Sequence, residues 1–405
     1  MRISARAPVV AALGTAQTLA WASSYYLPAM LAVPMARELG VAPATVFAAF
    51  SLAMVVSAFV GPASGRAIDR WGGRPVLMGT NLLFAAGLAA LGAAHGTVGL
   101  FAAWALLGVA MGSGLYESAF AALVRLYRQD ARSPITGITL IAGFASTVGW
   151  PLSAWLEAHH GWRGACFAWA GLHLLLGLPL NALLPGAPAA APAARAAAAP
   201  APAAAPARRR RRDTALLAFV FATTWFISTA MAAHLPRLLQ AAGATLAAAV
   251  AAGTLIGPAQ VGARLMEYGL LRRLHPLLSA RLAATAHPLG VLALLVFGAP
   301  LAPLFALLHG AGNGILTIAK GTLPLVLFGA SGYGARQGWL MFPARVAQAA
   351  APFAFGLAID RWGAGALWLS GGIGVAGLLS LLALHQVQPA RAAARQALSS
   401  ETERT

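Results

Sequence analysis

Gly65-Arg66-Ala67-Ile68-Asp69-Arg70-Trp71-Gly72-Gly73-Arg74-Pro75 is the stretch that decides the fold. It joins two apolar stretches, 43–64 and 76–95, each long enough to cross a bilayer as a helix. Its glycines let two helices and a tight loop approach closely. An aspartate among three arginines can form a charge-assisted network at the start of a helix. The stretch therefore predicts a tight charged turn between two membrane helices.

The composition around this stretch is that of a membrane protein. The chain has 405 residues, of which 59% are hydrophobic and 9% charged, whereas about a quarter are charged in soluble proteins. So few charges cannot solvate the surface of a soluble enzyme or keep a chain disordered. The apolar residues fall into blocks that predict twelve membrane-spanning helices: 9–35, 43–64, 76–95, 98–122, 134–156, 164–184, 214–236, 244–264, 278–298, 301–325, 337–358 and 364–386.

An Ala/Pro-rich interruption over 185–213, ending in Arg208 to Arg212, divides these spans into six plus six. Alternating Ala and Pro favours a polyproline-like or disordered tether. We therefore predict an all-α integral membrane protein made of two six-helix bundles, 1–184 and 214–390, with a linker between them and a tail over 391–405. Ser57-Ala-Phe-Val-Gly61-Pro62 and Gly253-Thr-Leu-Ile-Gly257-Pro258 occupy corresponding places in the two halves, which indicates an internal duplication.

The chain is strongly basic, with 28 Lys+Arg against 10 Asp+Glu and a net charge of +18. In a soluble protein this would suggest nucleic acid, but here the cations lie in short loops, mostly in every second one. The positive-inside rule explains that pattern and places both termini in the cytoplasm, with no nucleic-acid partner. The loops predicted on the other side hold only Arg37, Arg163, Arg237 and Arg361.

The sequence predicts no cofactor and no metal. Cys166 is the only cysteine, which excludes an intrachain disulfide and makes a thiolate metal site implausible, and no pair of histidines has metal-ligand spacing in a helix. A phosphate-binding glycine loop ending in Lys-Ser/Thr is also missing, which argues against a site for ATP hydrolysis.

The 65–75 stretch resembles the loop 2–3 signature of the major facilitator superfamily, and twelve spans with a basic central linker extend the resemblance over the whole chain. The resemblance implies secondary transport by alternating access, with this loop as a conformational latch on the cytoplasmic side. The residues that inherit the latch role are Gly65, Asp69, Arg70, Gly72, Gly73 and Arg74.

The chain also departs from the family pattern. The counterpart of the latch in the second half, 263–269, is degenerate. The arginine motif of the fourth helix is missing, which leaves Arg125 at its inner end as the nearest candidate for a gate. Gly356-Leu-Ala-Ile-Asp360-Arg361-Trp362-Gly363 looks like a better copy of the latch, but the predicted topology makes it a short outer turn. These departures leave the coupling mode open.

Two opposite charges mark a candidate cavity. Glu117 is the one carboxylate that lies clearly within a span, and Arg345 lies within span eleven. Counting helical rise puts them about 12 and 13 Å from the inner ends of their helices, so we predict one polar cluster. A buried charge is costly and therefore a functional candidate, although a structural pair is the alternative. Lys320, near the inner end of span ten, is interpreted as a snorkelling or gate residue.

Polar and aromatic side chains at corresponding places in the first helix of each half predict a cavity between the bundles. The alternative for each is a role in helix packing. The cavity candidates on these helices and on span ten are Gln17, Trp21, Tyr25, Thr224, Trp225, His309 and Asn313.

The sequence thus predicts a secondary transporter of a bacterial inner membrane that binds a small-molecule substrate in the lipid bilayer and works as a monomer. Proton-coupled export of a metabolite or toxic compound is the first interpretation, by analogy with many bacterial relatives. Uptake or exchange of a small organic anion is the second, because Arg345 has few carboxylates near it in the cavity. A membrane-embedded transferase is a remote third, since no acidic or nucleophilic cluster lies in a large loop.

Overall fold

The computed structural model describes residues 6–186 and 207–384, and every regular element within them is helical. The first half contains α1 (Ala7–Ala22), α2 (Leu27–Leu39), α3 (Pro43–Trp71), α4 (Gly73–Gly92), α5 (Gly96–Gly114), α6 (Tyr116–Tyr127), α7 (Arg132–Ile141), α8 (Ala145–Leu172) and α9 (Leu178–Ala182). Their inward faces share one continuous apolar core, which includes Trp104 and Trp169. The burial of this core holds the helices together as an N-terminal bundle.

The second half contains α10 (Ala207–Ala241), α11 (Leu246–Thr254), α12 (Ile256–Gly269), α13 (Pro276–Phe297), α14 (Ala302–Phe328), α15 (Tyr333–Trp362) and α16 (Ala366–Ala383). Two core clusters, one around Phe305 and one around Leu323, hold these helices together as a C-terminal bundle. Close approach depends on glycine at several crossings. A Cβ on Gly310, for example, would lie 2.7 Å from the Ile256 carbonyl oxygen.

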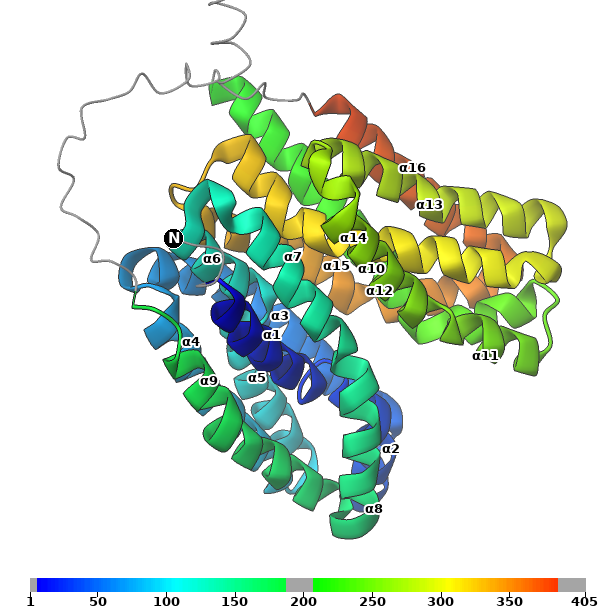
Figure 1. Cartoon of the computed structure of the whole chain (residues 1–405). Coiled ribbons are helices and arrows are strands. Elements are labelled where there is room, and N and C mark those ends of the chain that lie inside the picture. Colours follow the sequence, from blue (N-terminus) through cyan, green and yellow to red (C-terminus); the bar gives the residue numbers. More distant parts are fainter. Residues whose placement is uncertain (1–5, 187–206, 385–405) are drawn as a thin grey trace, which may run out of the picture.

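The two bundles meet at one end and diverge toward the other (Figure 1). The end where they meet carries Arg66, Arg70 and Arg74, and we call it the basic end. The helices α3 and α15 run antiparallel across the contact, with Gly61 against Gly338 and Phe59 against Phe342. At the other end, α2 and α8 of the first bundle lie far from α11 of the second (Figure 1). The structure is therefore closed at the basic end.

The first predicted span, 9–35, is not one helix as expected. It is divided into α1 and α2 by a turn at Ser23–Tyr26. Proline has no backbone N–H to donate within a helix, but it is tolerated in the first turn, where that N–H has no helical partner. Pro28 lies in the first turn of α2. The hydroxyl of Ser24 also donates to the carbonyl of Ala20 at 2.6 Å, which competes with the helical ladder.

Eight helical stretches of the described chain are long and apolar enough to cross a membrane, so the protein is an integral multi-pass membrane protein. Two of these stretches, Gly96–Ala182 and Tyr333–Ala383, contain several predicted spans each. Glycines with positive φ interrupt them, Gly161 at +68° and Gly363 at +55°. The number of exactly twelve spans stays a prediction, as do the cytoplasmic termini. Most of the predicted linker and the tail over 391–405 lie outside the described residues.

Candidate substrate cavity and contacts between the bundles

The structure brings Glu117 and Arg345 together at the interface between the bundles. Arg345 Nη2 donates to Glu117 Oε2 at 2.8 Å, and Arg345 Nη1 donates to Gln348 Oε1 at 3.1 Å. Glu117 lies in the first turn of α6, directly after α5 ends at Gly114, and Arg345 lies in the middle of α15. The two residues that the sequence placed at similar depth in opposite halves are thus in direct contact.

Lys320 of α14 is the third member of this group, which we call the charge cluster (Glu117, Lys320 and Arg345). Its Nζ lies 3.0 Å from Glu117 Oε1, and its side chain is 2% exposed. Snorkelling, one of the two interpretations of Lys320, does not agree with this position because the ammonium does not reach water; the gate role stays a prediction. Counting from a span end at 325 misplaced the residue, since α14 continues to Phe328 at the point where the bundles meet.

Aromatic rings cover the charge cluster. The rings of Trp21 and Trp225, from the first helix of each bundle, are stacked with centroids 6.3 Å apart. The Lys320 ammonium lies 4.4 Å from the centroid of Trp225, within the range of a cation–π interaction. Tyr25 packs edge-on against Trp21 at 5.3 Å. Three predicted cavity residues therefore form one aromatic wall beside the cluster.

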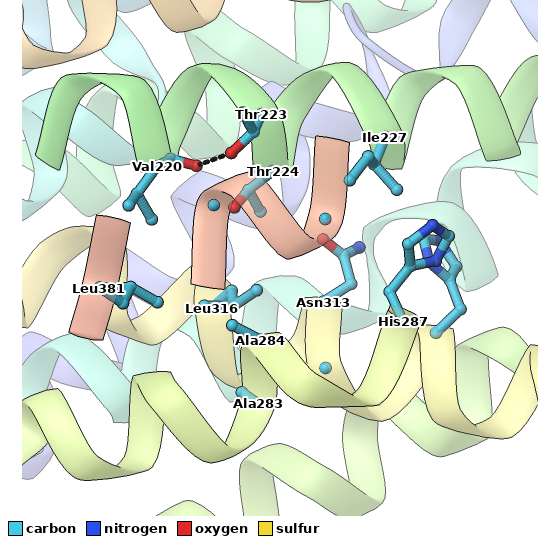
Figure 2. Close-up of a pocket in the computed structure, with 14 residues that line it drawn as sticks. Val220, Thr223, Thr224, Ile227, Ala283, Ala284, His287, Asn313, Leu316 and Leu381 are labelled. Carbon is cyan, nitrogen blue, oxygen red and sulfur yellow. Dashed lines mark hydrogen bonds between the residues drawn. The ribbon is translucent and has the colours of Figure 1, made fainter. Parts of the chain in front are cut away.

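The other predicted cavity residues lie elsewhere. Gln17 donates to the carbonyl of Gly114 at 2.7 Å and is 2% exposed, so it ties α1 to α5. Thr224, His309 and Asn313 line a cavity inside the C-terminal bundle, not the interface between the bundles (Figure 2). Sequence patterns indicated how deep in the membrane these residues lie, but not whether their side chains face the other bundle or the interior of their own.

The predicted latch contains one contact that joins the bundles. Asp69, at the end of α3, accepts hydrogen bonds from the backbone N–H groups of Gly334 at 3.0 Å and Ala335 at 2.9 Å. These groups are unpaired donors in the first turn of α15, and the positive end of the helix dipole adds to the attraction for a carboxylate. Gly65 permits the contact, because a Cβ there would overlap the carbonyl oxygen of Gly334.

The remaining latch residues shape the turn or lie on the surface. Gly72 has φ +89°, a conformation that favours glycine, and a Cβ on Gly73 would overlap Ala122. Arg70 and Arg74 are exposed, with the Arg70 guanidinium 5.7 Å from the ring of Trp71.

A second contact of the same kind was not predicted. Arg132, at the first position of α7, donates to Glu267 Oε1 of α12 at 2.7 Å, and Glu267 is 3% exposed. Arg264, also buried, donates to the carbonyl of Thr139 at 3.1 Å. Glu267 lies in the segment that the sequence described as a degenerate counterpart of the latch. Its position opposite the start of α7 mirrors Asp69 opposite the start of α15, and that correspondence could have revealed it.

One other site prediction, the gate role of Arg125, has no support from a contact. Arg125 is partly buried, and it forms no hydrogen bond or ion pair within residues 6–186 and 207–384, so its gate role stays a prediction. The same part of the chain holds no group of three side chains that could bind a metal ion.

We expect Asp69→Asn to weaken closure of the basic end, because the amide loses the charge and can accept only one of the two N–H groups. Hydrogen bonds to charged groups contribute about 1.5–3 kcal/mol each. Ala335→Pro removes one donor without touching Asp69 and is compatible with the first turn of a helix. Spin labels at Gln129 and Ser331, which are exposed on opposite bundles at the basic end, should show a larger population of long distances in both variants. Unchanged distances in both would show that Asp69 is an ordinary loop residue.

Comparison with known proteins gives a consistent family assignment. The family model of the Major Facilitator Superfamily matches residues 13–341, whereas no curated protein sequence matches. The fold is similar to that of the human organic anion transporter MFSD10 (TETRAN), with a TM-score of 0.69, 17% identity, and 94% of this chain and 100% of that chain covered. It is also similar to a variant of the E. coli fucose:proton symporter FucP, with a TM-score of 0.70, 13% identity, and coverage of 95% and 99%. FucP in the outward conformation gives a TM-score of 0.70, 13% identity, and coverage of 93% and 99%. The family consists of transporters and not enzymes, and this chain belongs to the Major Facilitator Superfamily.

Proposed function

We propose that the protein is a secondary active transporter that moves a small organic anion across the membrane by alternating access. The observation that carries the proposal is the composition of the charge cluster. Two cations, Lys320 and Arg345, face a single carboxylate, Glu117, at the buried interface between the bundles. With all three groups ionised, the cluster has a net charge of +1, and an anion would balance it.

The hydrogen-bonding state of the cluster supports an anionic ligand. Lys320 is paired with Glu117 through one contact of 3.0 Å, and its ammonium, which has three donors, has no other acceptor among the described residues. The indole N–H of Trp21, on the opposite bundle, is likewise buried without an acceptor there. Buried donors without partners are costly. A carboxylate or phosphate oxygen that reached Lys320 and Trp21 would satisfy both.

Closure of the site supports alternating access. The cavity beside Glu117 and Arg345 has a volume of about 10 Å³, which is room for one water at most. A substrate would approach from the side where the bundles diverge (Figure 1) and would have to separate Trp21 from Trp225 before it reached the cations. The two latches, Asp69 with α15 and Arg132 with Glu267, would then have to open to release it on the basic side.

Coupling to protons and the direction of transport are further parts of the proposal. The sequence favours export, and the positive cluster favours an organic anion; the same fold occurs in a transporter described as acting on organic anions and in a fucose:proton symporter. An export cycle would bind the anion on the basic side, which the charge pattern places in the cytoplasm, and release it where the bundles now diverge.

Flux into proteoliposomes tests the proposal. Protein reconstituted with a panel of labelled monocarboxylates, dicarboxylates, phosphate esters and neutral sugars should accumulate one of the anion classes and no neutral sugar. A protonophore should collapse that accumulation. Transport confined to a neutral solute, equally fast in Lys320→Met, would contradict the anion assignment. Loading the anion inside or outside the vesicles measures the direction.

A further inference from the structure

A small cavity with a mostly apolar lining lies among the helices of the C-terminal bundle, apart from the charge cluster. Helices α10, α13, α14 and α16 line it, and it has a volume of about 40 Å³ (Figure 2). A water needs about 10–15 Å³ of such space, so the cavity has room for about three waters. It is too small for an organic substrate, and its natural occupants are water and protons.

Two buried histidines from neighbouring helices meet in this cavity. His287 Nδ1 of α13 and His309 Nδ1 of α14 lie 3.1 Å apart, and the residues are 8% and 5% exposed. A hydrogen bond between two Nδ1 atoms needs one proton, carried by one ring and accepted by the other. In the neutral pair, the ring that donates through Nδ1 therefore has an unprotonated Nε2. Whichever tautomer is present, one Nε2 lone pair is free to accept a proton.

One nitrogen of the pair is buried without a partner, and other polar groups line the same cavity. His287 Nε2 is buried and has no hydrogen-bond partner within the described chain. The hydroxyl of Thr224 and the amide of Asn313 face the cavity (Figure 2). By contrast, the hydroxyl of neighbouring Thr223 is satisfied by the carbonyl of Val220 at 2.9 Å. A buried polar atom without a partner is costly, and this status applies to His287 Nε2. Thr224 and Asn313, which line the same cavity, could hydrogen-bond a hydrated imidazolium.

His173 in the N-terminal bundle is a buried histidine whose hydrogen bonds are typical of a structural role. His173 is 0% exposed, its Nε2 lies 2.8 Å from Ser23 Oγ, and its Nδ1 lies 2.9 Å from Asn81 Oδ1. Both ring nitrogens are thus satisfied by neutral partners, with Nδ1–H donating and Nε2 accepting. His173 has no nitrogen left for a further proton, whereas the C-terminal pair has one.

One helix that lines the cavity, α14, also carries Lys320 of the charge cluster, and another, α10, carries the Trp225 ring that packs against Lys320. On α10, Thr224 faces the cavity and the adjacent Trp225 contacts Lys320. On α14, His309 and Asn313 line the cavity, and Lys320 follows two turns later. No Asp, Glu, Lys or Arg side chain lines the cavity from α10, α13, α14 or α16, so the imidazoles are its titratable groups. A change in the charge of the imidazoles would therefore act on α14, which carries Lys320, and on α10, which carries Trp225.

The charge cluster itself is poorly suited to carry the proton. Protonation of Glu117 would leave two cations, Lys320 and Arg345, buried at 2% and 4% exposure without a counter-charge. Protonation of the histidine pair also buries a charge, which is costly, but it adds only one, beside a cavity with room for water. The sequence hypothesis that Glu117 carries the proton therefore has a rival site in the same bundle as the cations.

We propose that the His287–His309 pair binds the proton that is coupled to transport, on the free Nε2, with Asn313, Thr224 and cavity water as hydrogen-bond partners. The inference rests on the proposed transport function, and its first test is independent of the substrate because the ligand is the proton itself.

Nuclear magnetic resonance of the full-length protein with ring-labelled histidines reads protonation directly. As the pH is lowered from about 8 through and below the range where a free imidazole titrates, the signals of His287 and His309 should change together, and those of His173 should not. His287→Gln and His309→Gln assign the signals by their loss. A pair that keeps one protonation state over this range overturns the proposal, and so does a pair that responds to added Zn²⁺ but not to pH. The result stands even if no anion is transported.

Transport then tests the coupling role, with His173→Gln as the matched control. His287→Gln and His309→Gln should reduce gradient-driven accumulation of the anion by about tenfold or more, the size of a typical coupling free energy, and should leave counterflow exchange intact. His173→Gln should keep the two activities in their normal ratio. Normal accumulation in either variant of the pair, or parallel loss of accumulation and counterflow in both, overturns the coupling role.

Discussion

Arg345→Ala should weaken the apparent affinity for the transported anion by about 10- to 100-fold, because a charge-assisted hydrogen bond contributes about 1.5–3 kcal/mol. Removing this guanidinium leaves Glu117 with Lys320 alone, a neutral pair with no charge to offer an anion. Initial rates of uptake against anion concentration measure the effect. Arg361→Ala is the matched control, since Arg361 is exposed at the far end of the same helix.

A double variant in which Glu117 and Arg345 exchange their charges distinguishes an effect of net charge from an effect of the position of each charge. Glu117→Arg with Arg345→Glu keeps two cations and one carboxylate in the cluster, so it should recover part of the activity that either single variant loses. Arg345→Lys should give an intermediate affinity, because it keeps the charge but loses the two-pronged geometry. An Arg345→Ala variant with the affinity of the wild type would show that the guanidinium does not face the substrate.

Gly65→Ala should open the basic end. The added methyl group would overlap the Gly334 carbonyl oxygen, so α3 and α15 would have to separate. Overpacking of this kind costs about 1–3 kcal/mol, enough to shift a two-state equilibrium by about 5- to 150-fold. Spin labels at Gln129 and Ser331 should report mainly the open distance, and transport should slow because the closed state becomes rare.

Gly79→Ala is the control for this prediction. Gly79 lies on α4 of the same bundle, and a Cβ there meets nothing within 4 Å. Its replacement should leave the distance distribution and the transport rate as they are. If Gly65→Ala and Gly79→Ala have the same distances, the glycine contact between the bundles does not limit closure.

The sequence was informative about depth and uninformative about helix rotation. Helical rise predicted that Glu117 and Arg345 lie at one level, and they are in contact. The same reasoning put Thr224 and His309 in the central cavity, but their helices turn them into the C-terminal bundle. Composition and loop chemistry likewise predicted a helical membrane protein, since these depend on local residues alone.

The partners in the two contacts at the basic end were not predicted from local sequence patterns. The partners of Asp69 are backbone N–H groups, which have no side-chain signature, although the resemblance gave the residue a latch role. Glu267 and Arg132 are separated by more than a hundred residues, and only superposition of one half on the other would pair them. The break at Ser23–Tyr26 was missed because its hydrophobicity is continuous with the flanking helices.

The close contact between α3 and α15 also affects whether molecules can enter the interface between the bundles from the bilayer. Gly61 and Gly65 lie against Gly338 and Gly334 with no side chain between the backbones. On the opposite side of the interface, Arg264 bonds to Thr139. In this conformation, α3 and α15 leave no room for an acyl chain between them at these four glycines. If the protein works as proposed, we expect it to take its anion from water and not from the leaflet at the basic end.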